Sequence, residues 1–171
     1  LALVGLLLAA CGKAPLHQQE SFVFGTRVAI LIAGLEEAQA RPAAAAVLRE
    51  FDRLHRTYHA WQPSELSELN AAIAAGKTHA VSPELAFFIT DAQQRSALGE
   101  GRFDPGIGAL IRLWGFQSDE FKPVHPDASA LAAWRAARPG IVDVQLDGLQ
   151  VSSRNPAVSI DFGGYLKGVA L

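Results

Sequence analysis

The chain has 171 residues, of which 50% are hydrophobic and 19% charged, and this balance predicts one globular domain with a substantial core. Its 15 Lys and Arg residues stand against 17 Asp and Glu residues, so the formal net charge is -2. Because the sequence has no basic run, a nucleic-acid partner has no electrostatic support, and the composition also excludes a disordered chain.

The first residues are interpreted as the end of a secretory signal. Residues 1–10 are uncharged and apolar, too short to cross a bilayer of about 30 Å, and typical of a signal's hydrophobic region. Leu8-Ala9-Ala10-Cys11 resembles the bacterial lipobox, in which the cysteine thiol is acylated. We therefore expect residues 11–20 to be a lipidated tether and the protein to lie in the cell envelope, on the periplasmic side of the inner membrane or on the outer membrane. A buried N-terminal helix with an incidental cysteine is the alternative.

Residues 21–171 are expected to form the folded domain. A β-rich stretch over residues 21–34 is interrupted by Gly25-Thr26, which marks either a bulge close to a ligand or a simple hairpin turn. Pro42 is expected to start an alanine-rich helix whose apolar residues recur every three to four positions up to Tyr58.

Two capped helices are predicted next. Ser64 is the expected N-cap of a short helix that ends at Gly76, and Ser82-Pro83-Glu84 opens a longer one. Their buried stripes are expected to comprise Leu66, Leu69 and Ile73 in the first, and Leu85, Phe88, Ile89, Ala92 and Leu98 in the second. Trp61, at the entrance to the first helix, is interpreted from the residues alone as a core side chain rather than a platform for a flat ring.

A Gly-rich loop over residues 101–110 leads towards a further helix from Asp127 to Arg138. The loop could let the backbone approach a ligand closely, although Asp104, which precedes a proline, could equally cap the following turn. Val142, Val144 and Leu146 then alternate before Asp147-Gly148, which predicts a hairpin. Hairpins beside separate helices favour an α+β domain with mixed or antiparallel sheets and packed helices.

The stretch from Ser159 to Gly168 carries the strongest functional pattern. Val158, Ile160 and Phe162 alternate with polar residues as in a strand, and Gly163-Gly164 then precedes a helical run. Such a turn can gather backbone N–H groups around an anion, while Asp161 and Lys167 flank it with opposite charges. This combination suits a metal-assisted nucleotide site; the alternative is a tight turn with a surface salt bridge.

Four segments, in this order, resemble the ApbE-type FAD:protein FMN transferases. Phe24-Gly25-Thr26 resembles the family's early Met-Gly-Thr, and residues 61–70 resemble its Ser-x-Leu-Ser-x-Leu-Asn segment. Residues 103–116 resemble its Phe-Asp-Pro-Thr-x-Gly-x-Leu block closed by Leu-Trp-Gly-Phe, and residues 161–168 resemble its Asp-Leu-Gly-Gly-x-x-Lys-Gly. The resemblance covers most of the mature chain and corresponds to the N-terminal half of the family's domain.

The resemblance implies an ApbE-like (T-fold-like) domain that takes FAD and moves its FMN part onto a Thr or Ser hydroxyl, with Mg²⁺ and release of AMP. The acceptor would be a flavoprotein subunit of a membrane redox complex. The implied roles are flavin contact for Phe24, ring packing for Trp61, nucleotide lining for Arg102, Phe103 and Asp104, FAD binding for Asp161 and Lys167, and a carbonyl ligand to Mg²⁺ from Gly164. We expect Trp61, the Phe103 loop and Lys167 to share one cleft.

The departures from the family pattern define the alternatives. Phe24 replaces the family's Met, Gly106 replaces its usual Thr, and the later His loop and Asp-x-x-x-Thr/Ser metal segment are not in the chain. We therefore expect a fragment, clipped at both ends and without transferase activity by itself, since a carbonyl and one carboxylate do not fill a Mg²⁺ shell. The competing functions are a non-catalytic flavin- or solute-binding envelope lipoprotein and a purely structural one.

Overall fold

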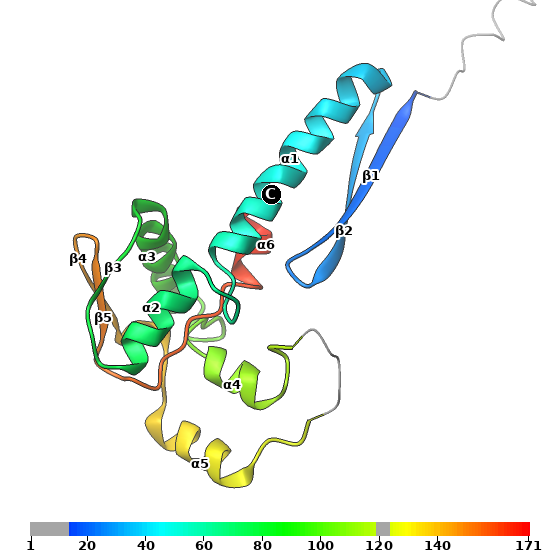
Figure 1. Ribbon diagram of the computed structural model, residues 1–171. Coiled ribbons are helices and arrows are strands. Elements are labelled where there is room, and N and C mark those ends of the chain that lie inside the picture. The colour runs from blue at the N-terminus through cyan, green and yellow to red at the C-terminus, as the bar shows by residue number, and fades with distance from the viewer. Residues whose placement is uncertain (1–13, 119–123) are drawn as a thin grey trace, which may run out of the picture. The chain divides into compact units, whose positions relative to one another are not determined.

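The computed structural model describes residues 14–118 and 124–171 (Figure 1). The signal-like segment and Cys11 lie outside the described residues, so the lipidation prediction is not addressed by the structure. The chain divides into two compact units between Arg53 and Leu54. Within the described ranges, no helix combines the length and the apolar character that a membrane span requires.

The first unit contains an antiparallel hairpin of β1 (Leu16–Val23) and β2 (Thr26–Ala33). Val23 pairs with Thr26, so Phe24 and Gly25 form the turn, with φ of +56° and +67°. Two successive positive φ angles are what a type I′ hairpin turn requires, so the simple hairpin alternative is confirmed. Residues 16–20, which the sequence assigned to the tether, belong to β1 because they pair with β2 over their whole length.

Helix α1 (Glu37–Thr57) starts earlier than the sequence predicts. The expectation that Pro42 opens it is wrong, because Pro42 lies inside the second turn. A proline there leaves one carbonyl of the first turn without its helical donor, a limited cost near a helix end. Phe24 at the hairpin turn packs on Phe51 of this helix, with ring centroids 6.1 Å apart.

The second unit is built from α2 (Glu65–Ala74), α3 (Pro83–Leu98) and a three-stranded antiparallel sheet in the order β3-β5-β4. The strands are β3 (His79–Ala80), β4 (Val144–Asp147) and β5 (Gln150–Ser153). Both predicted caps are confirmed: Ser67 and Leu85 donate their N–H groups to the hydroxyls of Ser64 and Ser82. The expected stripes are buried except for Leu98, which is 86% exposed at the last position of α3.

The predicted β4–β5 hairpin turns one residue later than expected. Asp147 pairs with Gln150, so the turn consists of Gly148 and Leu149, with a positive φ at Gly148. As a result Val151 is fully buried, whereas Leu149 is exposed. A shift of a single residue changes which side chain faces the core, since strand side chains alternate.

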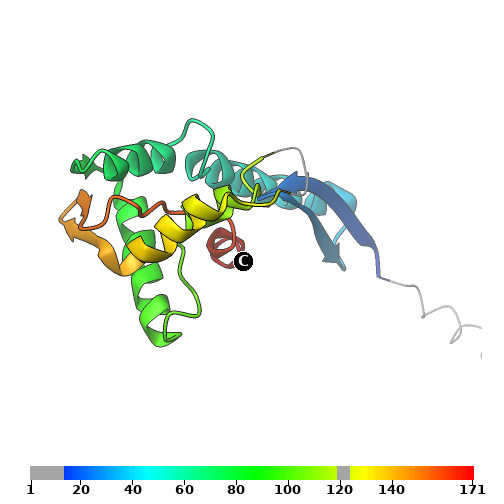
Figure 2. The ribbon, with the colours of Figure 1, turned by 90° about the horizontal axis from the view of Figure 1, so that it is seen from below.

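Three short helical elements and the 3₁₀ turn Ile141–Asp143 complete this unit. Helix α4 (Gly108–Leu113) contacts α5 (Ala128–Ala137), and the two lie side by side in both ribbon views (Figures 1 and 2). Asp127 caps α5 through the N–H of Ala130, as predicted. Helix α6 (Tyr165–Val169) follows the Gly163-Gly164 turn.

Phe162 lies in an aromatic cluster at the centre of the core. Its ring centroid is 5.1 Å from that of Tyr165 and 6.4 Å from that of Phe88, and Val158 and Ile160 are buried beside it in the sequence. The predicted alternation is therefore confirmed. The predicted strand is not, because the segment is extended but forms a single bridge, between Ser159 and Ile107.

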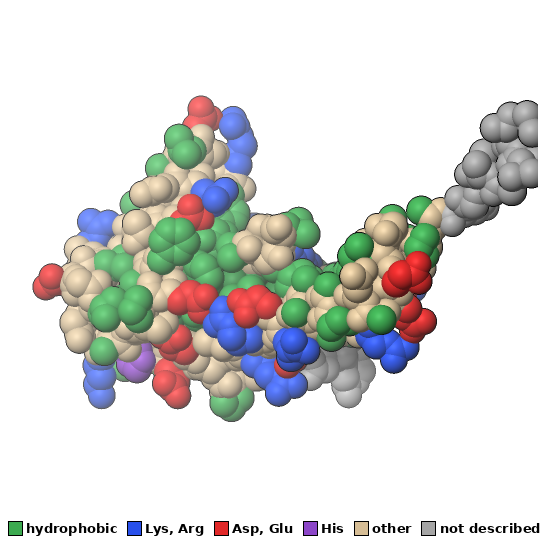
Figure 3. All heavy atoms as spheres, turned by 90° about the horizontal axis from the view of Figure 1, so that it is seen from above, with side chains coloured by type: hydrophobic (Ala, Val, Ile, Leu, Met, Phe, Trp, Pro, Cys, Tyr) green, Lys and Arg blue, Asp and Glu red, His purple; other side chains and the backbone are tan. Residues whose placement is uncertain are grey.

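The surface carries both signs of charge. On the face that Figure 3 shows, acidic and basic side chains are interspersed with hydrophobic ones, in agreement with the small net charge of -2. This distribution gives no basic footprint for a nucleic acid on that face.

Candidate functional site

The Gly-rich loop and the segment before Gly163 lie backbone to backbone. The N–H of Gly108 donates to the carbonyl of Ser159 at 2.7 Å, and the N–H of Asp161 donates to the carbonyl of Pro105 at 2.8 Å. A Cβ atom at Gly108 would stand 2.7 Å from that Ser159 oxygen. The glycine therefore allows close approach of protein backbone, whereas the sequence suggested close approach of a ligand.

Asn70 of α2 holds the same segment from a second direction. Its Nδ2 donates to the carbonyl of Ile160 at 2.8 Å, and its Oδ1 accepts the Ile160 N–H at 2.7 Å. The side-chain amide of Asn70 thus pairs with the backbone groups of Ile160, as a neighbouring strand would do in a sheet. Through this clamp, α2 fixes the position of Asp161.

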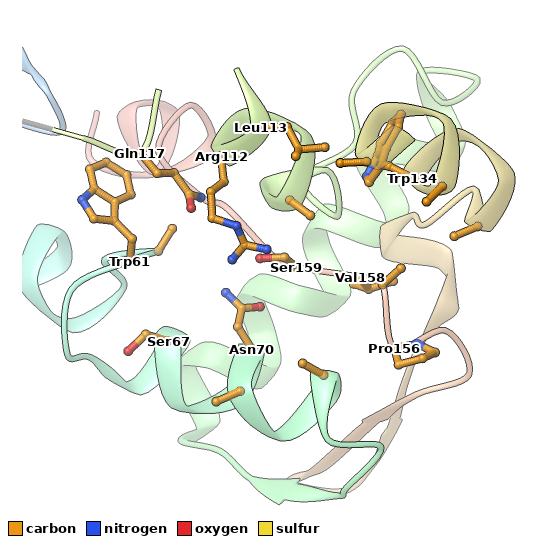
Figure 4. A pocket seen from close by; sticks show the side chains of 18 residues that line it. Trp61, Ser67, Asn70, Arg112, Leu113, Gln117, Trp134, Pro156, Val158 and Ser159 are labelled. Atoms are coloured by element: carbon orange, nitrogen blue, oxygen red, sulfur yellow. The ribbon is translucent and has the colours of Figure 1, made fainter. Parts of the chain in front are cut away.

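A cavity of about 790 Å³ opens between α2, α4, α5 and residues 156–159 (Figure 4). Alanines from the three helices make up much of its wall, and its polar side chains are Ser67, Asn70, Arg112, Gln117 and Ser159. The volume lies within the range of small-molecule and cofactor sites, which are mostly apolar with a few placed polar groups. This cavity is the leading candidate for a ligand site in the second unit.

Trp61 lines this cavity rather than the core. It is 41% exposed, and its ring stands edge-to-face on His59 with centroids 4.3 Å apart. His59 is itself buried, and its Nδ1 accepts the N–H of Gln62. The interpretation of Trp61 as a core side chain is therefore wrong. Its ring is packed against His59 at the edge of the cavity and stays exposed, so a flat ligand can reach it.

Asp161 is connected to the same cavity through Gln117. Its Oδ2 accepts from Gln117 Nε2 at 3.1 Å, and its Oδ1 accepts from the Gly163 N–H at 2.9 Å. The Gly163 donor is thus already used within the turn. In the part of the chain that the structure describes, no ion pair joins Lys167 to Asp161, so the alternative of a tight turn with a surface salt bridge lacks its salt bridge there.

The remaining predicted residues lie elsewhere. Phe103 lines a second cavity of about 330 Å³ together with Arg95, Tyr165 and Gly168. Arg102 is exposed and pairs with Glu100 at 3.0 Å. Phe24 belongs to the first unit, and Lys167 lines neither of these two cavities. Trp61 and Phe103 therefore border different cavities, so the expectation that both share one cleft with Lys167 is wrong for these two cavities. The ligand roles of the predicted residues stay predictions.

Asp104 acts as a cap, which is one of the two roles the sequence left open. Its Oδ1 accepts the N–H groups of Gly106 at 2.7 Å and Ile141 at 2.8 Å. This carboxylate ties the Gly-rich loop to the 3₁₀ turn. A Cβ at Gly106 would stand 2.6 Å from the carbonyl carbon of Gly140, so the glycine that replaces the family's Thr matches this close approach.

The second cavity has an acidic group beside its tyrosine. The Tyr165 hydroxyl donates to Asp91 Oδ2 at 2.7 Å, and Arg95 Nε donates to the same oxygen at 2.6 Å. The hydrogen bonds from Arg95 and then Tyr165 lower the pKa of the Asp91 carboxyl. Burial, followed by the bond to Asp91, raises the pKa of Tyr165, so this phenol stays protonated at neutral pH.

The described ranges contain no group of three or more His, Cys, Asp and Glu residues that could hold a metal ion. Near the Gly163-Gly164 turn, the hard oxygen donors with the predicted roles are the Asp161 carboxylate and the Gly164 carbonyl. Mg²⁺ needs six oxygens in octahedral geometry, which it commonly completes with water and substrate phosphates. The residues present therefore supply only part of a Mg²⁺ site.

The structure adds cavity residues that the sequence did not single out, namely Asn70, Arg112, Gln117, Trp134 and Ser159. Asn70 closes the motif around Trp61, and Gln117 directly follows the Leu-Trp-Gly-Phe block, so their neighbourhood was a usable signal. Nothing in the sequence places Trp134 opposite Trp61, because α5 is brought there by tertiary packing.

Comparison with known proteins identifies the family. The ApbE family model matches residues 24–171. A Rhodobacter capsulatus protein named FAD:protein FMN transferase is 38% identical over 171 residues, which are 100% of this chain and 33% of that protein. A protein of the same name from Chlamydia trachomatis serovar D is 30% identical over 133 residues, 72% of this chain and 39% of that protein.

Solved structures give the same result for the fold. The ApbE protein from Thermotoga maritima superposes with a TM-score of 0.79 at 27% identity, covering 92% of this chain and 50% of that one. The flavin transferase ApbE from Vibrio cholerae shares the fold, with a TM-score of 0.73 at 24% identity over 92% of this chain and 52% of that one. The chain spans about a third of the Rhodobacter relative and half of the Thermotoga protein. The α+β prediction is thus confirmed, and the chain belongs to the ApbE family.

Proposed function

We propose that the complete protein transfers FMN from FAD to a Thr or Ser hydroxyl of an acceptor flavoprotein, with Mg²⁺ as cofactor and AMP as the second product. The observation that carries this proposal is the 38% identity, over the whole of this chain, to a protein named FAD:protein FMN transferase. The match of residues 24–171 to the ApbE family supports it, since the segments that resemble the family's motifs lie in that range.

In the proposed reaction, the acceptor's hydroxyl oxygen forms a bond to the phosphorus of the FMN half of FAD. The bond from that phosphorus to the bridging oxygen breaks, AMP leaves with the electron pair, and the hydroxyl proton passes to a base. Little covalent chemistry is asked of the protein, because phosphoryl transfer depends on alignment and on neutralising charge. When bound, Mg²⁺ would supply part of that neutralisation.

The residues of this chain would act mainly by binding. Trp61 offers its face to a flat ring at the edge of the large cavity, and Phe24 and Phe103 are the other apolar contacts that we propose. Asp161 and Lys167 would bind FAD, with Arg102 and Asp104 beside the nucleotide. The Gly164 carbonyl would be one Mg²⁺ ligand, and a carbonyl needs no particular side chain to serve in this way.

We also propose a location and a partner. Acylation at Cys11 would anchor the protein on the periplasmic side of the inner membrane, or on the outer membrane. The acceptor would then be a flavoprotein subunit of a membrane redox complex, which would present its Thr or Ser to the same compartment. Labelling with a radioactive fatty acid, lost on Cys11→Ser, would support the anchor; unchanged labelling would contradict it.

The activity is tested by mass spectrometry of an acceptor that bears a Thr, after incubation with the complete protein, FAD and Mg²⁺. One added FMN mass is expected, and an acceptor with Ala in place of the Thr should gain none. If FAD binds and no adduct forms, the non-catalytic flavin-binding lipoprotein is the better description. If FAD does not bind, the protein is better described as a structural lipoprotein. The 171-residue chain alone is expected to transfer nothing, since the Gly164 carbonyl and the Asp161 carboxylate would hold a largely hydrated Mg²⁺ only weakly.

A further inference from the structure

Arg112 brings a positive charge to the wall of the large cavity, where its side chain is also exposed to solvent. It lies on α4, and Figure 4 shows its guanidinium reaching towards the amide of Asn70 and the hydroxyl of Ser159. Among the described residues, no hydrogen bond or ion pair engages this side chain. Other arginines of the same unit, such as Arg95 and Arg154, pair with carboxylates.

The surroundings of Arg112 do not neutralise it. None of the described residues that line the cavity is acidic. Asp161 is linked to the cavity through Gln117, and its carboxylate already accepts hydrogen bonds at both oxygens. Much of the wall is alanine and tryptophan, so one side of the guanidinium faces a partly apolar space. Because Arg112 is exposed, solvent screens it in part, and an anion there would be held moderately more strongly than in bulk water.

The far wall of the cavity is also aromatic. Trp134 of α5 stands across the cavity from Trp61 (Figure 4), and its Nε1 is buried with no hydrogen-bond partner among the described residues. A buried indole N–H normally has an acceptor. The cavity therefore combines a guanidinium without a partner and the exposed ring of Trp61, while the Trp134 N–H is enclosed in the wall.

We propose that Arg112 binds a phosphate group of the flavin nucleotide, with one of the nucleotide's flat rings against Trp61. The planar fork of a guanidinium matches phosphate oxygens two at a time, and a cavity with both a cation and an aromatic edge suits a molecule that carries a phosphate on a ring-bearing chain. This inference rests on the proposed function and adds a specificity-determining residue to it. Asn70 and Ser159 hold the backbone beside the phosphate and keep that end of the cavity polar.

The test compares three ligands on the complete protein: FAD, FMN and riboflavin, of which the last two differ only in the phosphate. Arg112→Gln is expected to weaken FAD and FMN binding by about tenfold to a hundredfold, the range for hydrogen bonds to a charged group, and to leave riboflavin binding within about twofold. Arg112→Lys should fall between, because it keeps the charge and loses the fork. Arg135→Gln is the matched control, since Arg135 is exposed on α5 and does not line the cavity.

The riboflavin measurement also reports folding, because a misfolded variant would lose all three ligands. If Arg112→Gln binds FMN as tightly as the wild type, or loses FMN and riboflavin equally while its circular dichroism spectrum matches that of the wild type, the phosphate contact is refuted. An equal loss of FMN affinity in Arg135→Gln would also refute it, since the effect would then be one of general charge. If the wild type binds no flavin at all, the proposed function fails, and this inference fails with it.

Discussion

Replacing Asn70 by Ala tests the clamp on the segment that carries Asp161. The substitution removes both hydrogen bonds between the side-chain amide and the backbone N–H and C=O of Ile160, a fully buried residue. Each buried backbone group left without a partner costs about 1–3 kcal/mol, so the two together would cost about 2–6 kcal/mol. Because Asn70 borders the cavity, water can reach part of the gap, and we expect a loss in the lower half, about 2–4 kcal/mol.

The assay is urea unfolding of the complete protein, followed by fluorescence, with Glu68→Ala as the control on the exposed face of the same helix. The control should change the free energy of unfolding by no more than about 0.5 kcal/mol. Asn70→Asp keeps an acceptor for the Ile160 N–H but turns a second oxygen towards the Ile160 carbonyl. It should therefore be unstable at pH 7 and partly recover in acid, where a protonated carboxyl can donate. A loss in Asn70→Ala no larger than in the control would refute the clamp.

Three further predictions concern single residues. Lys167→Ala should weaken FAD binding about tenfold while Lys77→Ala does not, as measured by calorimetry on the complete protein; equal affinities would remove the role proposed for Lys167. Gly106→Thr, which restores the family's usual residue, should destabilise the fold by about 1–3 kcal/mol or more, because its Cβ would stand 2.6 Å from the carbonyl carbon of Gly140; a neutral result would show that this approach is not needed. The lowered pKa of Asp91 contributes stability that is present above the carboxyl's unfolded value of about 4 and lost as the pH falls further. The stability gap between wild type and Asp91→Asn should therefore shrink from pH 5 to pH 3, and a gap that is constant over this range would contradict it.

Local signals were sufficient for most of the helices. Ser64, Ser82 and Asp127 each cap a helix, because a side-chain oxygen followed by free N–H groups satisfies the first turn without help from the rest of the fold. The predicted start of α1 at Pro42 was wrong because it used only a local signal. A proline is favourable in the first turn of a helix, yet α1 begins at Glu37. Residues 16–20 misled because a polar composition does not reveal that a partner strand lies alongside.

The candidate site was predicted only in part. The four motifs indicated the family, and Trp61 and the Asp161 turn were selected with them. The sequence could not show that the Gly163 N–H is used by Asp161, that Asp104 serves the backbone of Ile141, or that Trp61 and Phe103 border different cavities. The last two depend on contacts between residues far apart in the chain, and the first depends on the conformation of the turn, which the sequence does not fix.

The amino-acid sequence thus determined the α+β class, the capped helices, the alternating burial around Ile160 and the family, since all of these are written in neighbouring residues and their spacing. The tertiary structure decided where α5 packs, which amide clamps Ile160, and that Arg112 and Trp134 meet in one cavity with Trp61. Those features arise only when segments up to 90 residues apart come together, and a cavity is a property of that packing rather than of any one segment.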